Sequence, residues 1–192
     1  MKTSLFLTGA LMFAQAAFAG TIIYETNLLG SLEVPSNTSP GTGFAEVIVD
    51  TTAQTMEVQV SFSGLLGTTT ASHIHCCTTA PGSGNAGVAT TTPTFTLFPL
   101  GVTSGTYDHT FDLTASSSYN PAFVTAEGSV VNAEAALLAG LAADETYLNI
   151  HTTVVPGGEI RGYLVATPEP ATIFLSGGGL LGLSILRRRA KS

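Results

Sequence analysis

Short runs in which apolar and polar side chains alternate recur along most of this 192-residue chain. The clearest occupies residues 55–62, TMEVQVSF, where every second side chain is apolar. Alternation of this kind places one face of a strand against a core and the other in water. Similar runs lie at residues 21–32, 43–50, 94–98, 107–113, 146–152 and 159–165, separated by clusters of Gly, Pro, Ser and Asn. Seven or more short strands at this spacing predict an all-β domain, an antiparallel sandwich or barrel.

Two segments depart from the alternation. Residues 130–142, VVNAEAALLAGLA, carry Ala, Leu and Glu at helical spacing, and Asn132 stands where it could cap a helix. We therefore expect one short crossover helix. Residues 78–92, TTAPGSGNAGVATTT, are rich in turn-forming residues and have little apolar pattern, which predicts a long surface loop.

The first nineteen residues have the organisation of a secretory signal peptide. Lys2 precedes an apolar stretch over residues 5–18, and the segment closes on the small residues Ala17 and Ala19. Such a segment is removed during export, with cleavage expected after Ala19. The mature chain is therefore expected to work outside the cytoplasm.

The last segment, residues 167–192, combines three features in order. They are the tripeptide Pro168, Glu169 and Pro170, sixteen uncharged residues from 171 to 186, and the basic residues Arg187, Arg188, Arg189 and Lys191. The uncharged run is just short of the roughly 17 to 25 residues of a transmembrane helix, and the basic cluster would hold its cytoplasmic end. We expect a short transmembrane helix.

This segment resembles the PEP-CTERM sorting signal of Gram-negative bacteria. The resemblance implies transient insertion into the inner membrane and recognition of residues 168–170 by an exosortase. The ectodomain would then be released or re-anchored at the outer surface or outside the cell, in an exopolysaccharide or biofilm context.

Residues 20–166 are long enough for one domain with its own core. They contain twelve of the thirteen acidic residues but only one basic residue, Arg161, so their net charge is −11 with neutral histidines. A surface of this charge repels phosphate backbones, which argues against nucleic acid as a partner. Divalent cations, or an exopolysaccharide bridged through them, suit it better.

Two histidines stand one residue apart at His73 and His75, in what reads as a strand. Their side chains leave one face about 7 Å apart along the chain. His151 has the same relation to Tyr147 and Asn149 in a later strand, so three imidazoles could hold Cu or Zn with one position open. The alternative is that these histidines lie on a solvent-facing or interior polar face of the strand and bond to backbone carbonyls. His109 has no neighbouring ligand in the sequence and is expected at the surface.

Cys76 and Cys77 are the only cysteines, and they are adjacent. Free thiols seldom persist in exported proteins. Three states stay open: a vicinal disulfide at the strand end, soft ligation of Cu(I), or two buried reduced thiols.

Glu159 and Arg161 share a strand face, and Arg161 is the one cation of an acidic domain. We expect them to form a structural ion pair at the edge of the fold; recognition of an anionic sugar is the alternative.

Several segments together resemble the CHRD domain first named from chordin. They are residues 32–35, LEVP; residues 41–44; residues 73–75, HIH; residues 149–152, NIHT; and residues 156–162, PGGEIRG. The resemblance spans about residues 22–165 and implies an immunoglobulin-like or superoxide-dismutase-like antiparallel β-sandwich. His73 and His75 match the copper-binding HxH of Cu/Zn superoxide dismutase. The bridging histidine and the zinc ligands of that enzyme have no counterpart, and Cys76 stands where the CHRD motif usually has Gly.

The leading hypothesis for function is a non-enzymatic exported domain that contributes to the cell surface or extracellular matrix. No nucleophile elbow, phosphate loop or metalloprotease motif is present. The alternative is a copper-binding or weak redox protein using the three histidines. Capture of a polysaccharide by the Thr-rich loops is a third reading, with no residue signature.

Overall fold

The computed structural model describes residues 20–167, which form one curled antiparallel sheet that packs against itself as a sandwich. The predicted signal peptide and the predicted C-terminal helix lie outside these residues. The strands are β1 (Thr21–Leu29), β2 (Thr42–Asp50), β3 (Thr55–Ser63), β4 (Thr69–His75), β5 (Gly105–Asp112), β6 (Tyr147–Thr152), β7 (Ile160–Tyr163) and β8 (Val165–Ala166). Their order across the sheet is β4-β6-β7-β1-β2-β3-β5, with β8 paired to β1.

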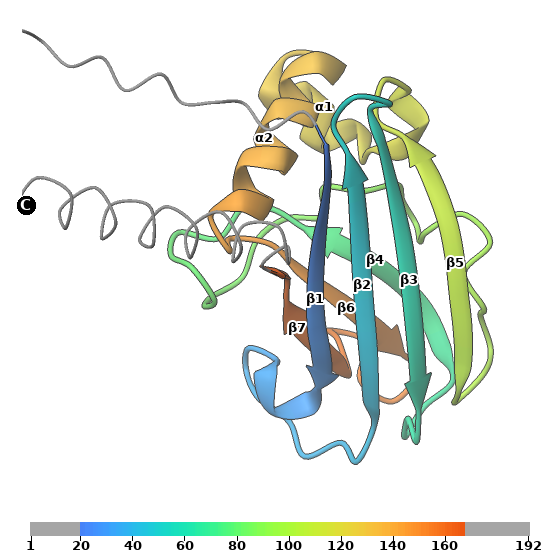
Figure 1. Cartoon of the computed structure of the whole chain (residues 1–192). Helices are drawn as coiled ribbons and strands as arrows, with labels where there is room; N and C mark the ends of the chain where they lie inside the picture. Colours follow the sequence, from blue (N-terminus) through green and yellow to red (C-terminus); the bar gives the residue numbers. More distant parts are fainter. Residues whose placement is uncertain (1–19, 168–192) are drawn as a thin grey trace, which may run out of the picture.

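Figure 1 shows the two layers of the sandwich, with β1, β2, β3 and β5 in front and β4, β6 and β7 crossing behind them. Alternation explains the front layer. Met56, Val58, Val60 and Phe62 of β3 all point inward and are at most 4% exposed. The predicted all-β sandwich is confirmed, and each predicted strand except one appears within a few residues of its expected bounds.

The exception is residues 94–98, which form turns rather than a strand. Phe95 and Phe98 are buried, but Leu97 is 85% exposed and has a positive φ of 64°. The Phe95 N–H donates to Ser72 O, and the Phe98 N–H closes a turn onto Phe95 O. The apolar alternation here reflects a loop that inserts two aromatic rings into the core.

Two α-helices, not one, cover one end of the sandwich (Figure 1). The predicted helix is α2 (Val130–Ala142), but its cap is Ser129, whose hydroxyl accepts from the Asn132 N–H, so the expected capping role of Asn132 is wrong. Helix α1 (Pro121–Glu127) was not predicted because it buries none of its residues. Its sequence signal was Asn120 before Pro121, and the Asn120 side chain accepts from the Ala122 N–H.

The chain between β4 and β5, residues 76–104, packs over the outer side of β4 and is called the covering loop below. Residues 78–92 were predicted as a surface loop, yet Ala89 and Thr90 are fully buried. Ala89 and Thr90 N–H groups both donate to Ile74 O on the edge strand β4. The loop therefore blunts an otherwise unpaired sheet edge and buries its own apolar residues. Two short 3₁₀ turns, Gly30–Leu32 and Ser116–Ser118, complete the described chain.

Candidate metal centre

Strands β4 and β6 present two different faces. Ile74, Leu148 and Ile150 point into the hydrophobic core and are fully buried. His73 and His75 alternate with Ile74, and His151 follows Ile150, so the three histidines share the opposite face, under the covering loop. The apolar residues between the histidines occupy the core side, and the histidine face lies beneath the covering loop, where His73 and His75 are at most 8% exposed. This agrees with the expectation of an interior polar face.

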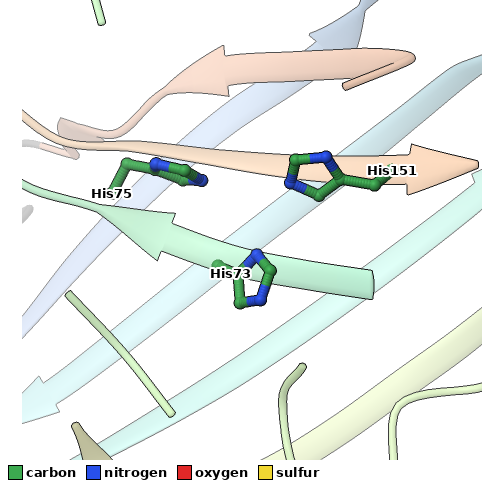
Figure 2. A group of neighbouring side chains, drawn as sticks. All are labelled: His73, His75 and His151. Atoms are coloured by element: carbon green, nitrogen blue, oxygen red, sulfur yellow. The ribbon is translucent and has the colours of Figure 1, made fainter. Parts of the chain in front are cut away.

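Pairing between the two strands brings the histidines together. His151 lies opposite Ala71, two residues from His73, and Tyr147 lies opposite His75. The ring centroid of His73 lies 5.8 Å from that of His75 and 5.4 Å from that of His151. One ring nitrogen from each histidine lies within 4.8 Å of the other two. Figure 2 shows these nitrogens turned toward one another from β4 and β6.

Each ring is fixed through its other nitrogen by a backbone carbonyl. His73 Nε2 is 2.7 Å from Pro93 O, and His151 Nδ1 is 2.9 Å from Pro156 O. His75 Nδ1 is 2.9 Å from Ala86 O. A carbonyl only accepts, so each of these nitrogens carries the ring proton. The facing nitrogens, His73 Nδ1 and His151 Nε2, are buried and have no hydrogen-bond partner.

Burial keeps these rings neutral. Desolvation lowers the pKa of His73 to about 4, against the favourable effect of its bond to Pro93, and the neighbouring histidines lower it further. Desolvation also lowers the pKa of His75 and of His151 below the usual range. Neutral imidazoles have free lone pairs at pH 7, so all three side chains are ready to act as ligands without losing a proton.

The described residues contain no other group of three or more such ligands within bonding reach of one ion. His109 lies apart on β5, where its ring packs 4.7 Å from Phe111 and is half-buried rather than fully at the surface. Cys76 and Cys77 are joined in a disulfide and point to the helix side, where both sulfurs approach the Ala136 carbonyl of α2. They stand apart from the histidines, and the vicinal disulfide is the one of the three expected states that the structure contains.

Arg161 does not pair with Glu159. Its Nε lies 3.1 Å from Glu33 Oε2, and both side chains are at most 5% exposed. The Glu159 carboxylate instead accepts from Ser39 Oγ, Thr152 Oγ1 and two backbone N–H groups at residues 66 and 67, which hold its pKa below the usual range despite burial. The expected pair is wrong because Glu159, which directly precedes β7, and Arg161, within β7, contact different loops.

Arg161 secures the covering loop beside the histidines. Its guanidinium lies 4.5 Å from the Tyr147 ring centroid and donates to Gly84 O at 3.1 Å. Tyr163 donates to the same carbonyl at 2.9 Å. His75 in turn stacks on Tyr147 at 4.6 Å. Sequence reasoning missed Glu33 as the partner of Arg161; both lie in segments that resemble one domain family, but nothing in their spacing pairs them.

Comparison with protein families agrees with this architecture. Residues 24–164 match the CHRD domain, and residues 166–189 match the PEP-CTERM protein-sorting motif. No curated protein and no solved structure matches the chain. Among residues 20–167 no helix is long and apolar enough to cross a membrane, and the predicted anchor at residues 171–186 lies beyond them. The chain belongs to the CHRD domain family and carries a C-terminal PEP-CTERM motif, which makes it an exported protein sorted by an exosortase to the cell surface.

Proposed function

We propose that this protein is a non-catalytic surface protein whose CHRD domain binds one copper or zinc ion through His73, His75 and His151. One observation carries the proposal: three neutral imidazoles converge on one point, and each donates its remaining N–H to a backbone carbonyl. Metal-binding histidines almost always have such an outer partner, because it fixes the tautomer and the ring orientation.

In a polar cluster that binds no ion, the second nitrogen of each histidine would have no reason to face the others. Buried ring nitrogens without hydrogen-bond partners are also energetically costly. Here His73 Nδ1 and His151 Nε2 are both buried, unpartnered and close together. A cation between them would satisfy both lone pairs.

Three imidazole nitrogens are a donor set that suits zinc and copper. Nitrogens bound to one zinc at about 2.0 to 2.1 Å lie roughly 3.4 Å apart, so separations of up to 4.8 Å must contract on binding. His151 is the least buried of the three and is the penultimate residue of β6, so it has the most freedom to move.

A binding role is favoured over a dismutase role. A Cu/Zn dismutase needs a second metal site and a bridging histidine, and the described part of the chain offers one three-histidine cluster. The net charge of −11 over residues 20–166 also suits a matrix protein that contacts an anionic exopolysaccharide through divalent cations.

The test is metal analysis of the full chain, expressed with its own export signal and purified without chelator. After incubation with Cu²⁺ or Zn²⁺ and dialysis, wild type should retain about one equivalent, and His73→Ala and His151→Ala should retain little. His109→Ala is the matched control, because it removes a histidine of β5 that lies outside the cluster. Retention below about 0.1 equivalent by wild type ends the metal proposal.

A further inference from the structure

Asn149 is the fourth polar side chain of the histidine face. It lies directly opposite His73 on β4 and opposite Arg161 on β7, and it is 2% exposed. Paired residues on neighbouring strands have Cβ atoms roughly 4.5 to 5.5 Å apart. Asn149 on β6 therefore lies between His73 on one side and Arg161, with its partner Glu33, on the other. Its Oδ1 lies 3.1 Å from His75 Nε2.

In this contact two hydrogen-bond acceptors, His75 Nε2 and Asn149 Oδ1, face each other. His75 Nδ1 faces the Ala86 carbonyl at 2.9 Å, and a neutral ring has only one proton to give. That carbonyl belongs to the chain backbone and cannot turn, so Nδ1 keeps the proton and Nε2 is a bare lone pair. In a buried site, a lone pair facing a carbonyl oxygen at 3.1 Å is unfavourable unless something positive lies between them.

The amide cannot simply turn over. Its Nδ2 and Glu33 Oε1 both lie beside Gly158, so the N–H₂ group is on the side of the carboxylate. Burial raises the pKa of Glu33 to about 7, and Arg161 and Asn149 both oppose this rise. Turning the amide would point its oxygen at the carboxylate. Glu33 is itself held by Arg161. These contacts from Arg161 through Glu33 therefore hold Asn149 Oδ1 toward His75 Nε2, one of the ring nitrogens of the three-histidine cluster.

From this geometry we infer that Asn149 supplies the fourth ligand, Oδ1, to the ion held by His73, His75 and His151. The inference rests on the three-histidine centre proposed above. Two ligand atoms of one tetrahedral ion at about 2.1 Å lie roughly 3.4 Å apart, and His75 Nε2 and Asn149 Oδ1 already lie close to that spacing. The site is then closed, with four protein ligands, as in structural zinc centres.

An amide oxygen also sets the preference of the site. It is a hard donor, whereas Cu(I) prefers soft sulfur ligands. Three imidazoles with one amide oxygen hold a divalent ion such as Zn²⁺ or Cu²⁺. The centre thereby serves as a structural or ion-capturing site that keeps the metal in its divalent state.

The experiment uses Co²⁺, whose visible absorption reports coordination, with the full chain freed of metal by a chelator. Wild type should bind one Co²⁺ and give a spectrum that millimolar azide leaves unchanged, because no position is open. Asn149→Leu, which keeps the branched shape of the side chain but lacks the oxygen, should weaken Co²⁺ binding at least tenfold and give a spectrum that azide shifts.

Asn27→Leu is the matched control, because Asn27 is an exposed asparagine on β1, away from the histidines. It should behave as wild type. Equal Co²⁺ affinity and equal azide response in wild type and Asn149→Leu would overturn the role of Asn149 while leaving the three-histidine centre intact. Failure of wild type to bind Co²⁺, Zn²⁺ or Cu²⁺ would overturn both. If Asn149→Leu does not fold, the azide response of wild type decides alone: a shift of the wild-type Co²⁺ spectrum by azide contradicts the inference.

Discussion

Replacing Arg161 by Met removes the only cation that faces Glu33 inside the domain. Met preserves most of the side-chain stem, so the lost terms are electrostatic. The cation–π contact with Tyr147 contributes about 1 to 2 kcal/mol when desolvated, and the bond from the guanidinium to Gly84 O contributes about 1.5 to 3 kcal/mol. We expect unfolding to be about 3 kcal/mol easier at pH 5, where Glu33 is protonated.

The loss of stability caused by Arg161→Met should increase with pH. Burial raises the pKa of Glu33 in the folded protein from the usual 4.5 to about 7. In wild type its stabilising contribution is therefore present below pH 4.5 and is lost as the pH rises toward 7. Removing Arg161 takes away the charge that lowers this pKa, so in the variant the loss continues above pH 7. Each unit of added shift is worth about 1.4 kcal/mol. The total at pH 8 should reach about 4 to 5 kcal/mol, in the range for breaking a buried ion pair.

The assay is urea denaturation of metal-free protein at pH 5 and pH 8. In thermal denaturation of a domain of this size, a loss of 3 kcal/mol corresponds to a fall in Tm of about 10 °C. The double variant Glu33→Gln with Arg161→Met is the control, because it leaves no uncompensated carboxylate and should lose the extra cost at pH 8. A change below about 1 kcal/mol for Arg161→Met at both pH values would refute the structural role that we assign to the pair.

Three further predictions follow from the contacts described above. Metal-free wild type should lose about 3 kcal/mol of stability through His73 between pH 6.5 and pH 4, because the unfolded ring binds a proton that the buried ring, with a pKa of about 4, refuses; stability profiles of wild type and His73→Gln that run parallel would contradict this. Gly140→Ala should destabilise the protein by about 1 to 2 kcal/mol, since its Cβ would lie 2.5 Å from Cys77 Sγ and 2.6 Å from Cys76 Sγ, a clash that outweighs the helix-propensity gain of about 1 kcal/mol; Gly87→Ala, with nothing within 4 Å, is the control for denaturant midpoints. Replacing Pro168, Glu169 and Pro170 by Ala should leave the protein in the inner-membrane fraction of a Gram-negative host that carries an exosortase, and normal release by that variant would argue against the motif as the sorting determinant.

Local patterns in the sequence predict much of this fold. Alternation identifies the strands because one face of each must meet the core, as in β3. The pattern fails at residues 94–98, where Phe95 and Phe98 enter the core from a loop, because alternation alone cannot distinguish a paired strand from a loop segment with two inserted rings. Helix α1 escapes because it is short and contributes nothing fully buried.

The candidate site divides in the same way. His73, His75 and His151 could be predicted, because a two-residue spacing fixes the face and two such strands can pair. Which side of the sheet they occupy could not, since it depends on Ile74 and Ile150 between them meeting the core. The carbonyls that orient the rings, and the contacts of Glu33 and Asn149, come from loops and pairings distant in the chain.

The most direct test of the metal centre is an X-ray structure of the protein crystallised with Zn²⁺, with data collected on both sides of the zinc absorption edge. Our account predicts one strong anomalous peak about 2.0 to 2.1 Å from a ring nitrogen of each of His73, His75 and His151, under the covering loop. A crystal grown with Zn²⁺ that shows no anomalous peak among these three rings, or shows zinc bound only elsewhere, would contradict it.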